Sequence, residues 1–211
     1  MSRARLITLE GGEGVGKSTQ AELLAGALEG AGLDVVLTHE PGGAPGAEEI
    51  RRLLVEGEAG RWDGLAETLL HVAARRDHLA RVIEPALAAG TWVVSDRFAD
   101  STTAYQGHGH GVDLSLIDAL YRMIAGDLIP DLTLILDIDL DLGLERAQGR
   151  GPGEDRYENM DRAFHERLRQ GFLTIAEAEP KRCKLIDAGG SEAEVQARII
   201  AAAKSQFPKH L

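Results

Sequence analysis

The fold of this chain is decided by the stretch Leu6-Ile-Thr-Leu9-Glu10-Gly11-Gly-Glu-Gly-Val-Gly16-Lys17-Ser18-Thr19. Its first four residues are apolar or β-branched and predict a short buried strand. The remainder fits the pattern G-x-x-x-x-G-K-[ST], and residues 17–31 then show helical spacing. Glycines in such a loop let backbone N–H groups converge on phosphate oxygens, and the helix N-terminus adds partial positive charge. The stretch therefore predicts a phosphate-binding P-loop between a strand and a helix.

The P-loop also predicts roles for individual residues. Lys17 is expected to reach the β- and γ-phosphates of ATP, and the Ser18 hydroxyl is expected to bind Mg²⁺. Glu13 is unusual, because two like charges 4 Å apart repel by roughly 4 kcal/mol at an effective dielectric constant near 20. Either Glu13 points to solvent, or it accepts a hydrogen bond from a sugar hydroxyl of a second substrate. The residues expected to bind ATP are Gly11, Gly12, Glu13, Gly14, Val15, Gly16, Lys17, Ser18 and Thr19.

Short apolar segments alternate with longer segments of helical spacing along the whole chain. The predicted strands are residues 6–9, 34–38, 92–95, 132–137 and 184–186. The predicted helices are residues 17–31, 48–55, 65–88, 114–126, 140–147, 159–178 and 192–204. Such alternation is typical of right-handed crossovers and of a parallel sheet covered on both faces. We therefore expect an α/β fold, a P-loop NTPase-type three-layer sandwich with a five-stranded parallel sheet and helices on both faces, in one domain over residues 1–211.

Composition and charge exclude several classes of protein. The chain has 211 residues, with 23 Lys and Arg against 34 Asp and Glu, and its formal net charge is −11. Proteins that bind DNA or RNA usually carry the opposite sign, so no nucleic-acid polymer is expected as a partner. The single cysteine excludes a disulfide framework within the chain and fits a reducing compartment. No apolar run approaches the ~20 residues of a membrane span, so we expect a cytoplasmic protein without a membrane partner.

Residues 149–155 do not fit a buried core. They contain glycine and proline without an apolar anchor, and Arg146, Arg150 and Arg156 lie in or beside them. One interpretation is a solvated loop. The other is a mobile basic lid, over about residues 146–157, that closes on an anionic ligand.

Further motifs resemble those of thymidylate kinases (dTMP kinases). The longest is Val94-Ser-Asp96-Arg97-Phe98-Ala-Asp-Ser101-Thr102-Thr-Ala-Tyr105-Gln106-Gly107, and the shorter ones are His39-Glu40-Pro41-Gly42-Gly43 followed by Arg51, and Ala73-Ala74-Arg75. The resemblance runs in order from residue 6 to about residue 186. It implies ATP- and Mg²⁺-dependent phosphorylation of dTMP to dTDP, feeding dTTP synthesis, by a homodimer with a doubly wound parallel sheet.

The resemblance also implies a role for each matching residue. Glu13 would bind the 3′-hydroxyl of dTMP, Arg97 would hold the acceptor phosphate beside Arg51, and Arg75 and Gln106 would read the thymine edge. The Tyr105 ring would disfavour ribonucleotides, and Asp96 would lie near Mg²⁺ together with Ser18. The residues expected to bind dTMP are Glu13, Pro41, Arg51, His71, Arg75, Arg97, Ser101, Thr102, Tyr105 and Gln106.

The catalytic cations implied by the resemblance lie in the P-loop, after a strand and on the lid. Because the P-loop contains no arginine, the chain is similar to the bacterial subtype that supplies arginines from the lid. The expected catalytic residues are Lys17, Arg97, Arg146, Arg150 and Arg156. No general base is needed, because the second pKa of a nucleotide phosphate is near 6 and the acceptor is already mostly dianionic at neutral pH.

Three positions depart from the family pattern, and two other functions stay open. His71 stands where relatives stack a phenylalanine on thymine, Gln148 stands where some have a further lid arginine, and His110 replaces an arginine. One alternative is a kinase for another nucleoside monophosphate. The other is a P-loop nucleotide switch that binds partners, although the Asn-Lys-x-Asp element of guanine switches is missing, since Asn159 is followed by Met160.

Overall fold

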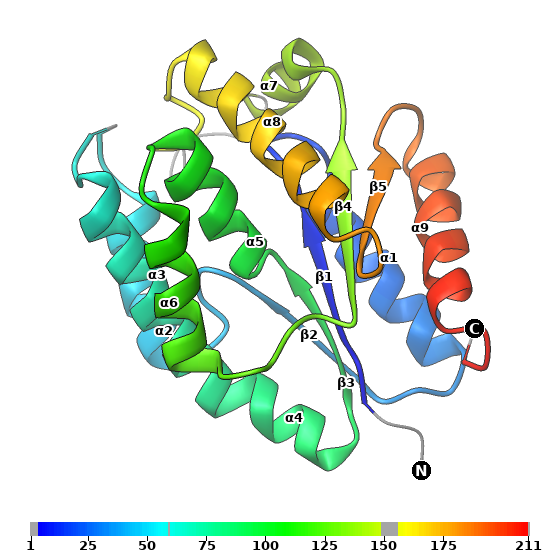
Figure 1. Ribbon diagram of the computed structural model, residues 1–211. Coiled ribbons are helices and arrows are strands. Elements are labelled where there is room, and N and C mark those ends of the chain that lie inside the picture. The colour runs from blue at the N-terminus through cyan, green and yellow to red at the C-terminus, as the bar shows by residue number, and fades with distance from the viewer. Residues whose placement is uncertain (1–3, 59, 149–155, 211) are drawn as a thin grey trace.

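The computed structural model describes residues 4–58, 60–148 and 156–210, and its centre is a parallel sheet (Figure 1). The strands are β1 (Leu6–Glu10), β2 (Val35–His39), β3 (Trp92–Asp96), β4 (Leu132–Asp137) and β5 (Cys183–Asp187). Every pairing is parallel, and the order across the sheet is β2-β3-β1-β4-β5. The ends of each strand lie within one residue of the predicted segment, and the predicted five-stranded parallel sheet is confirmed.

Helices cover both faces of this sheet. On one face, α1 (Lys17–Gly30) packs beside α9 (Glu192–Gln206), as Figure 1 shows. The other helical segments are α2 (Pro45–Val55), α3 (Gly64–His78), η1 (Leu79–Ile83), α4 (Glu84–Ala89), α5 (Ala99–Thr102), η2 (Thr103–Gly109), α6 (Leu114–Ala125), α7 (Leu140–Gln148) and α8 (Arg162–Ala178). Within the described residues, no helix combines the length and the apolar character that crossing a bilayer requires.

The alternation of side chains along the strands builds a separate core on each face. Ile7 and Leu9 of β1 join the cluster under α1 and α9, whereas Leu6 packs with Val93 and Phe98 on the opposite face. All five residues of β1 are buried. A strand buried on both sides is what a central position in a parallel sheet requires.

Two helical segments differ in kind from the predicted ones, while α2 begins three residues earlier and α8 three residues later than predicted. The segment predicted as one helix over 65–88 is divided into α3, the π-helical η1 and α4. Pro85 lacks an N–H and its ring crowds the carbonyl four residues earlier, so a widened turn just before it is the expected response. The glycine-rich residues after Thr102 form the π-helical η2, which was not predicted. A Cβ at Gly107 would collide with Leu114, and one at Gly109 with Phe164, so these glycines allow close packing against α6 and α8.

The P-loop lies at the carboxyl end of β1, pressed between β4 and α7. Gly11 has φ 136° and Gly14 has φ 69°, backbone conformations that favour glycine. A Cβ at Gly11 would overlap the Leu136 carbonyl, and one at Gly14 would overlap the Gly143 carbonyl. The glycines therefore fix the loop against its neighbours as well as opening it to a ligand.

Candidate functional site

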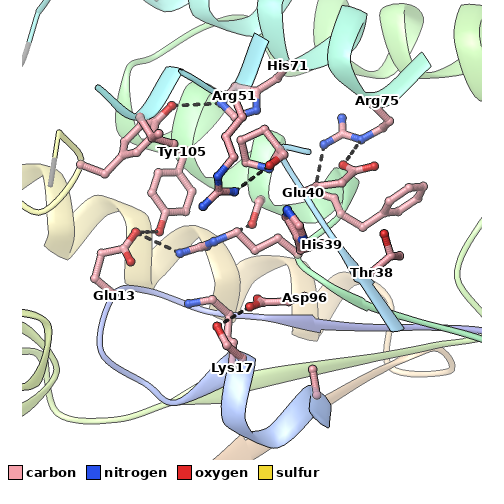
Figure 2. A pocket seen from close by; sticks show the side chains of 18 of the residues that line it. Glu13, Lys17, Thr38, His39, Glu40, Arg51, His71, Arg75, Asp96 and Tyr105 are labelled. Atoms are coloured by element: carbon pink, nitrogen blue, oxygen red, sulfur yellow. Dashed lines mark hydrogen bonds and ion pairs between the residues drawn. The ribbon is translucent and has the colours of Figure 1, made fainter. Parts of the chain in front are cut away.

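A cavity of about 700 Å³ opens at the carboxyl ends of β1, β2 and β3. Most of the predicted site residues line it, and Figure 2 shows many of their side chains. The predicted residues that line it are Glu13, Lys17, Ser18, Pro41, Arg51, His71, Arg75, Asp96, Arg97, Ser101, Tyr105 and Gln106. The structure thus brings the P-loop, the β3 end, α3 and η2 to one concave surface, which is the usual place for a ligand in an open α/β sheet.

Glu13 does not point into solvent; its side chain is 12% exposed and faces the centre of the cavity (Figure 2). Its Oε1 accepts hydrogen bonds from Tyr105 Oη at 2.5 Å and from Arg97 Nη2 at 2.9 Å. Burial raises the pKa of the Glu13 carboxyl, but Arg97, Lys17 and the Tyr105 hydroxyl together lower it to about 2. Of the two interpretations of Glu13, the solvent-facing one is therefore wrong, and an ionised acceptor sits inside the cavity.

Arg97 is held in place by its backbone conformation and by the residues that surround its side chain. It has φ 69°, a left-handed conformation that is uncommon outside glycine, and its N–H donates to the Leu9 carbonyl at 2.9 Å. Its Nη1 donates to the Gly11 carbonyl at 3.0 Å, and its guanidinium lies 5.0 Å from the centre of the Tyr105 ring. Burial lowers the pKa of Arg97, but Tyr105 and Glu13 raise it above its ordinary value. The side chain is a permanent, pre-oriented cation.

Ser18 and Asp96 form a small group of oxygen atoms next to Lys17. Ser18 Oγ donates to Asp96 Oδ2 at 2.5 Å, while Lys17 Nζ donates to the Gly12 carbonyl at 2.6 Å. Asp96 Oδ1 is buried and finds no hydrogen-bond partner in the described part of the chain. No group of three His, Cys, Asp or Glu residues that could hold a metal occurs within the described ranges. Mg²⁺ usually takes one or two carboxylates together with substrate phosphates, so this pair of side chains fits it.

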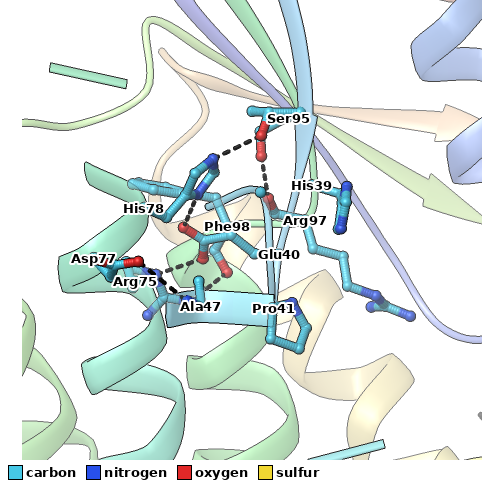
Figure 3. A network of polar contacts seen from close by, with 12 residues as sticks. His39, Glu40, Pro41, Ala47, Arg75, Asp77, His78, Ser95, Arg97 and Phe98 are labelled. Atoms are coloured by element: carbon cyan, nitrogen blue, oxygen red, sulfur yellow. Dashed lines mark hydrogen bonds and ion pairs between the residues drawn. The ribbon is translucent and has the colours of Figure 1, made fainter. Parts of the chain in front are cut away.

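Glu40 fixes the orientation of Arg75 (Figure 3). Arg75 Nε donates to Glu40 Oε2 at 2.7 Å, and His78 Nδ1 lies 3.0 Å from Glu40 Oε1. Arg75 Nη2 donates to Thr102 Oγ1 at 3.0 Å. Thr102 was predicted to line the nucleotide pocket, but it lies behind Arg75 and supports it instead, because its hydroxyl is the acceptor that this buried guanidinium needs. Arg75 thus reaches the cavity in a fixed direction.

Glu67 on α3 is the centre of a second buried group. Its Oε1 accepts a hydrogen bond from Gln106 Nε2 at 2.8 Å, and its Oε2 accepts one from Arg156 Nη2. Arg156 Nη1 also donates to the Leu54 carbonyl at 2.9 Å, and the Arg156 side chain is 0% exposed. This corrects the prediction for Arg156. A fully buried guanidinium that is paired with a carboxylate cannot also bind phosphates in the cavity. If Arg156 moved away, the charge of Glu67 would be left buried without its partner.

The other residues predicted for the lid and the base pocket are placed as follows. His71 Nε2 lies 3.0 Å from Tyr157 Oη, and burial chiefly lowers the pKa of His71 to about 4, so the ring is neutral at pH 7. Arg51 Nη1 donates to the Pro41 carbonyl at 2.6 Å. Arg146 is exposed on α7 and does not line the cavity, and Arg150 lies outside the described residues.

Comparison with known proteins gives a match over most of the chain. The family model described as thymidylate kinase matches residues 9–199. The chain belongs to the thymidylate kinase family. Similar curated proteins include the thymidylate kinase of Caulobacter vibrioides, which is 55% identical over 94% of this chain and 95% of its own. That of Rhizorhabdus wittichii is 52% identical over 97% of this chain and 99% of its own. The crystal structure of thymidylate kinase from Ehrlichia chaffeensis aligns with a TM-score of 0.78 and 38% identity, over 96% of this chain and 100% of that one.

Two carboxylates that orient site residues were not predicted from the sequence: Glu40, which binds Arg75, and Glu67, which binds Gln106. Glu67, His71 and Arg75 stand four residues apart on α3, so they share one face of the helix. That spacing was the available signal for Glu67. The role of Glu40 is not visible in the motif of residues 39–43, because its partner Arg75 is 35 positions away.

Proposed function

We propose that the enzyme binds ATP and dTMP end to end in the cavity, with the donor in the P-loop and the acceptor between α3 and η2. The reaction itself, phosphorylation of dTMP to dTDP, follows from family membership. The single observation that carries the proposed arrangement is the meeting of Glu13 from the P-loop with Arg97 from the β3 end and Tyr105 from η2. A carboxylate and a cation at one point suit a ligand that carries both hydroxyl and phosphate groups.

The acceptor phosphate is assigned to Arg97, with Arg51 beside it. Two guanidinium groups give the fork of N–H donors that matches phosphate oxygens. Because a nucleotide phosphate is already mostly dianionic at neutral pH, the residues here need to align it and mask its charge, not to remove a proton. A pre-oriented Arg97 needs no reorganisation at the moment of transfer, which is where its contribution to the rate lies.

The sugar of dTMP is assigned to Glu13 and Tyr105. Glu13 remains ionised and accepts hydrogen bonds, so it suits the 3′-hydroxyl, which donates one. The Tyr105 hydroxyl is engaged by Glu13, and its ring packs edge-on against Tyr157 with centres 5.2 Å apart. A ring fixed from two sides cannot yield to a 2′-hydroxyl, and this supports selection of deoxyribonucleotides.

The donor side is assigned to Lys17, Ser18 and Asp96. Ser18 and Asp96 would hold Mg²⁺, which supplies charge neutralisation and orientation of the ATP phosphates when bound. Lys17 is 6% exposed and lies at the start of α1, where its ammonium group and the helix N-terminus both favour phosphate. Arg146 and Arg150 remain the proposed lid cations of the bacterial subtype, whereas Arg156 holds the end of the lid to the body of the protein.

A homodimer of this one-domain chain is proposed to form through the exposed apolar face of α3 and α6. Leu65 and Leu69 on α3 are 46% and 49% exposed, and Met123 on α6 is 72% exposed. Leu79 and Ile83 of η1, which directly follows α3, are buried within the chain itself. A Leu69→Glu variant should sediment as a monomer, whereas an unchanged sedimentation coefficient would place the interface elsewhere.

An assay of ADP release across nucleotide acceptors tests the proposed function. With Mg²⁺ and ATP, we expect release that depends on dTMP and is lost on chelation of the metal. The acceptors dUMP, dCMP, AMP and GMP give the specificity profile. The variant Arg97→Lys tests the assignment of the acceptor phosphate, because a single ammonium group cannot reproduce the fork of guanidinium N–H donors. ADP release without an acceptor, or equal rates with AMP, would refute the proposal.

A further inference from the structure

We propose that Glu67 is a positioning residue that sets the direction of the Gln106 amide, and so restricts the enzyme to pyrimidines that carry a hydrogen on N3. The inference rests on the proposed function, in which Gln106 faces the base. It adds a residue that touches no substrate but decides which hydrogen-bonding groups the substrate meets.

The geometry gives Gln106 a single direction. Gln106 is 1% exposed, lines the cavity, and donates from Nε2 to Glu67 Oε1 at 2.8 Å. Its Oε1 is buried without a hydrogen-bond partner among the residues that the structure describes. The NH₂ group of the amide therefore has a partner in the protein, whereas its carbonyl oxygen can still accept a hydrogen bond from a ligand. A buried acceptor left unpaired is destabilising, so a ligand N–H that reaches it is favoured.

The charge on Glu67 excludes the opposite direction of the amide. Burial raises the pKa of Glu67, but the neighbouring His110, His71 and Arg156 side chains lower it to about 2. At neutral pH the carboxylate has no hydrogen to donate, so only the NH₂ group of Gln106 can face it. If the amide turned over, two oxygen atoms would face each other in a buried site. The ionised state of Glu67 thus determines that Gln106 presents its carbonyl oxygen, and not its NH₂ group, to a ligand.

Glu67 is itself held so that it cannot follow the amide. Arg156 Nη2 binds its other oxygen, His110 Nε2 lies 3.4 Å from Oε1, and the Glu67 side chain is 0% exposed. Arg156 in turn is fixed by the Leu54 carbonyl. The carboxylate therefore acts as a rigid reference against which the Gln106 amide is set.

The resulting pattern matches one edge of a pyrimidine. Uracil and thymine present a donor at N3 and an acceptor at O4, whereas cytosine presents an acceptor at N3 and a donor at N4. Gln106 offers an acceptor. Arg75 offers only donors, because a guanidinium has no acceptor, and its Nε and Nη2 are occupied by Glu40 and Thr102. At N3, cytosine would place an acceptor against the Gln106 acceptor. A site built to hydrogen-bond one base strongly rejects an analogue that cannot form that bond.

The test compares dUMP with dCMP, which differ only at this edge, in wild type and Glu67→Gln. A glutamine at 67 can donate or accept, so the Gln106 amide is free to turn. We expect the dUMP-to-dCMP ratio of kcat/KM to fall at least about 10-fold, with a parallel fall in the ratio of dissociation constants measured by calorimetry without ATP. An unchanged ratio in a folded variant would overturn the inference.

Two further variants keep the result interpretable. Asp100→Asn breaks another buried ion pair, in which Arg182 donates to Asp100 at 2.7 and 2.8 Å, and it should leave the ratio unchanged. An equal change in that control would mean general loosening and would overturn the inference. If Glu67→Gln does not fold, Gln106→Leu should collapse the ratio, and a preserved ratio there would refute the role of the amide. Failure of the wild type to use dTMP would instead refute the proposed function.

Discussion

Replacement of Arg156 by methionine separates two roles for this residue, an anchor buried in the protein and a cation that closes on phosphate. Arg156 is 0% exposed, binds Glu67 and the Leu54 carbonyl, and lies with its guanidinium 5.2 Å from the centre of the Tyr157 ring. Methionine is of similar length but carries no charge. The change therefore leaves the carboxylate of Glu67 buried without the guanidinium that binds it.

The expected loss of stability follows from the unpaired, buried charge of Glu67. Removing one partner of a buried ion pair costs about 3–5 kcal/mol. In a chain of this size each kcal/mol lowers Tm by about 2–4 °C, so we expect a loss of about 6–20 °C. Gln106 and His110 remain beside Glu67, which favours the lower half of that range. The double variant Arg156→Met/Glu67→Met should regain at least half of the loss, because no unpaired buried charge is then left at this position.

Thermal unfolding followed by circular dichroism, together with kcat measured well below Tm, distinguishes the two roles. An anchor predicts the fall in Tm, recovery in the double variant, and a kcat that remains within about 10-fold of wild type. A Tm within 2 °C of wild type combined with a kcat lowered by about 10²–10³, the typical effect of removing one transition-state donor, would refute the anchor.

Three other predictions follow from the site. Lys17→Ala should lower kcat by at least about 10²–10³ while the circular dichroism spectrum stays unchanged, and near-normal turnover would contradict its assignment to the ATP phosphates. Glu13→Gln should weaken dTMP binding, measured by calorimetry, more than ATP binding; equal losses would remove Glu13 from the acceptor site. Because the pKa of His71 is lowered to about 4, the unfolded chain takes up a proton below pH 6.5 that the folded chain does not. The free energy of unfolding should therefore decrease as the pH is lowered from 6.5 to about 4. In His71→Phe that part of the decrease should be missing from urea titrations at pH 7 and 4.5; an unchanged pH dependence would argue against a lowered pKa of His71 in the folded chain.

The strands and the P-loop could be predicted because their signals are local. Buried parallel strands are short apolar runs, and the predicted ends lie within one residue of those observed. The segment η2 could not be predicted in this way, since its glycines carry no helical signal. Their reason is tertiary, as Gly107 and Gly109 leave room for Leu114 and Phe164.

The candidate site could be predicted as a set of residues but not as a set of contacts. Arg156 was assigned to the lid because it stands near Arg150 in sequence, whereas its partner Glu67 is 89 positions away. The burial of Arg156 depends on its pairing with a residue of a distant segment, and such a pairing cannot be read from a single sequence. Glu13 illustrates the same limit, because only the positions of Arg97 and Tyr105 decide between solvent and cavity.

The most direct test of the shared cavity is calorimetry with a bisubstrate ligand, in which adenosine and thymidine are joined through a polyphosphate. We expect one ligand to bind per chain, to compete with both ATP and dTMP, and to have a Kd well below that of either nucleotide. Competition with only one nucleotide, or an affinity no better than that of ATP alone, would contradict the end-to-end arrangement on which the account depends.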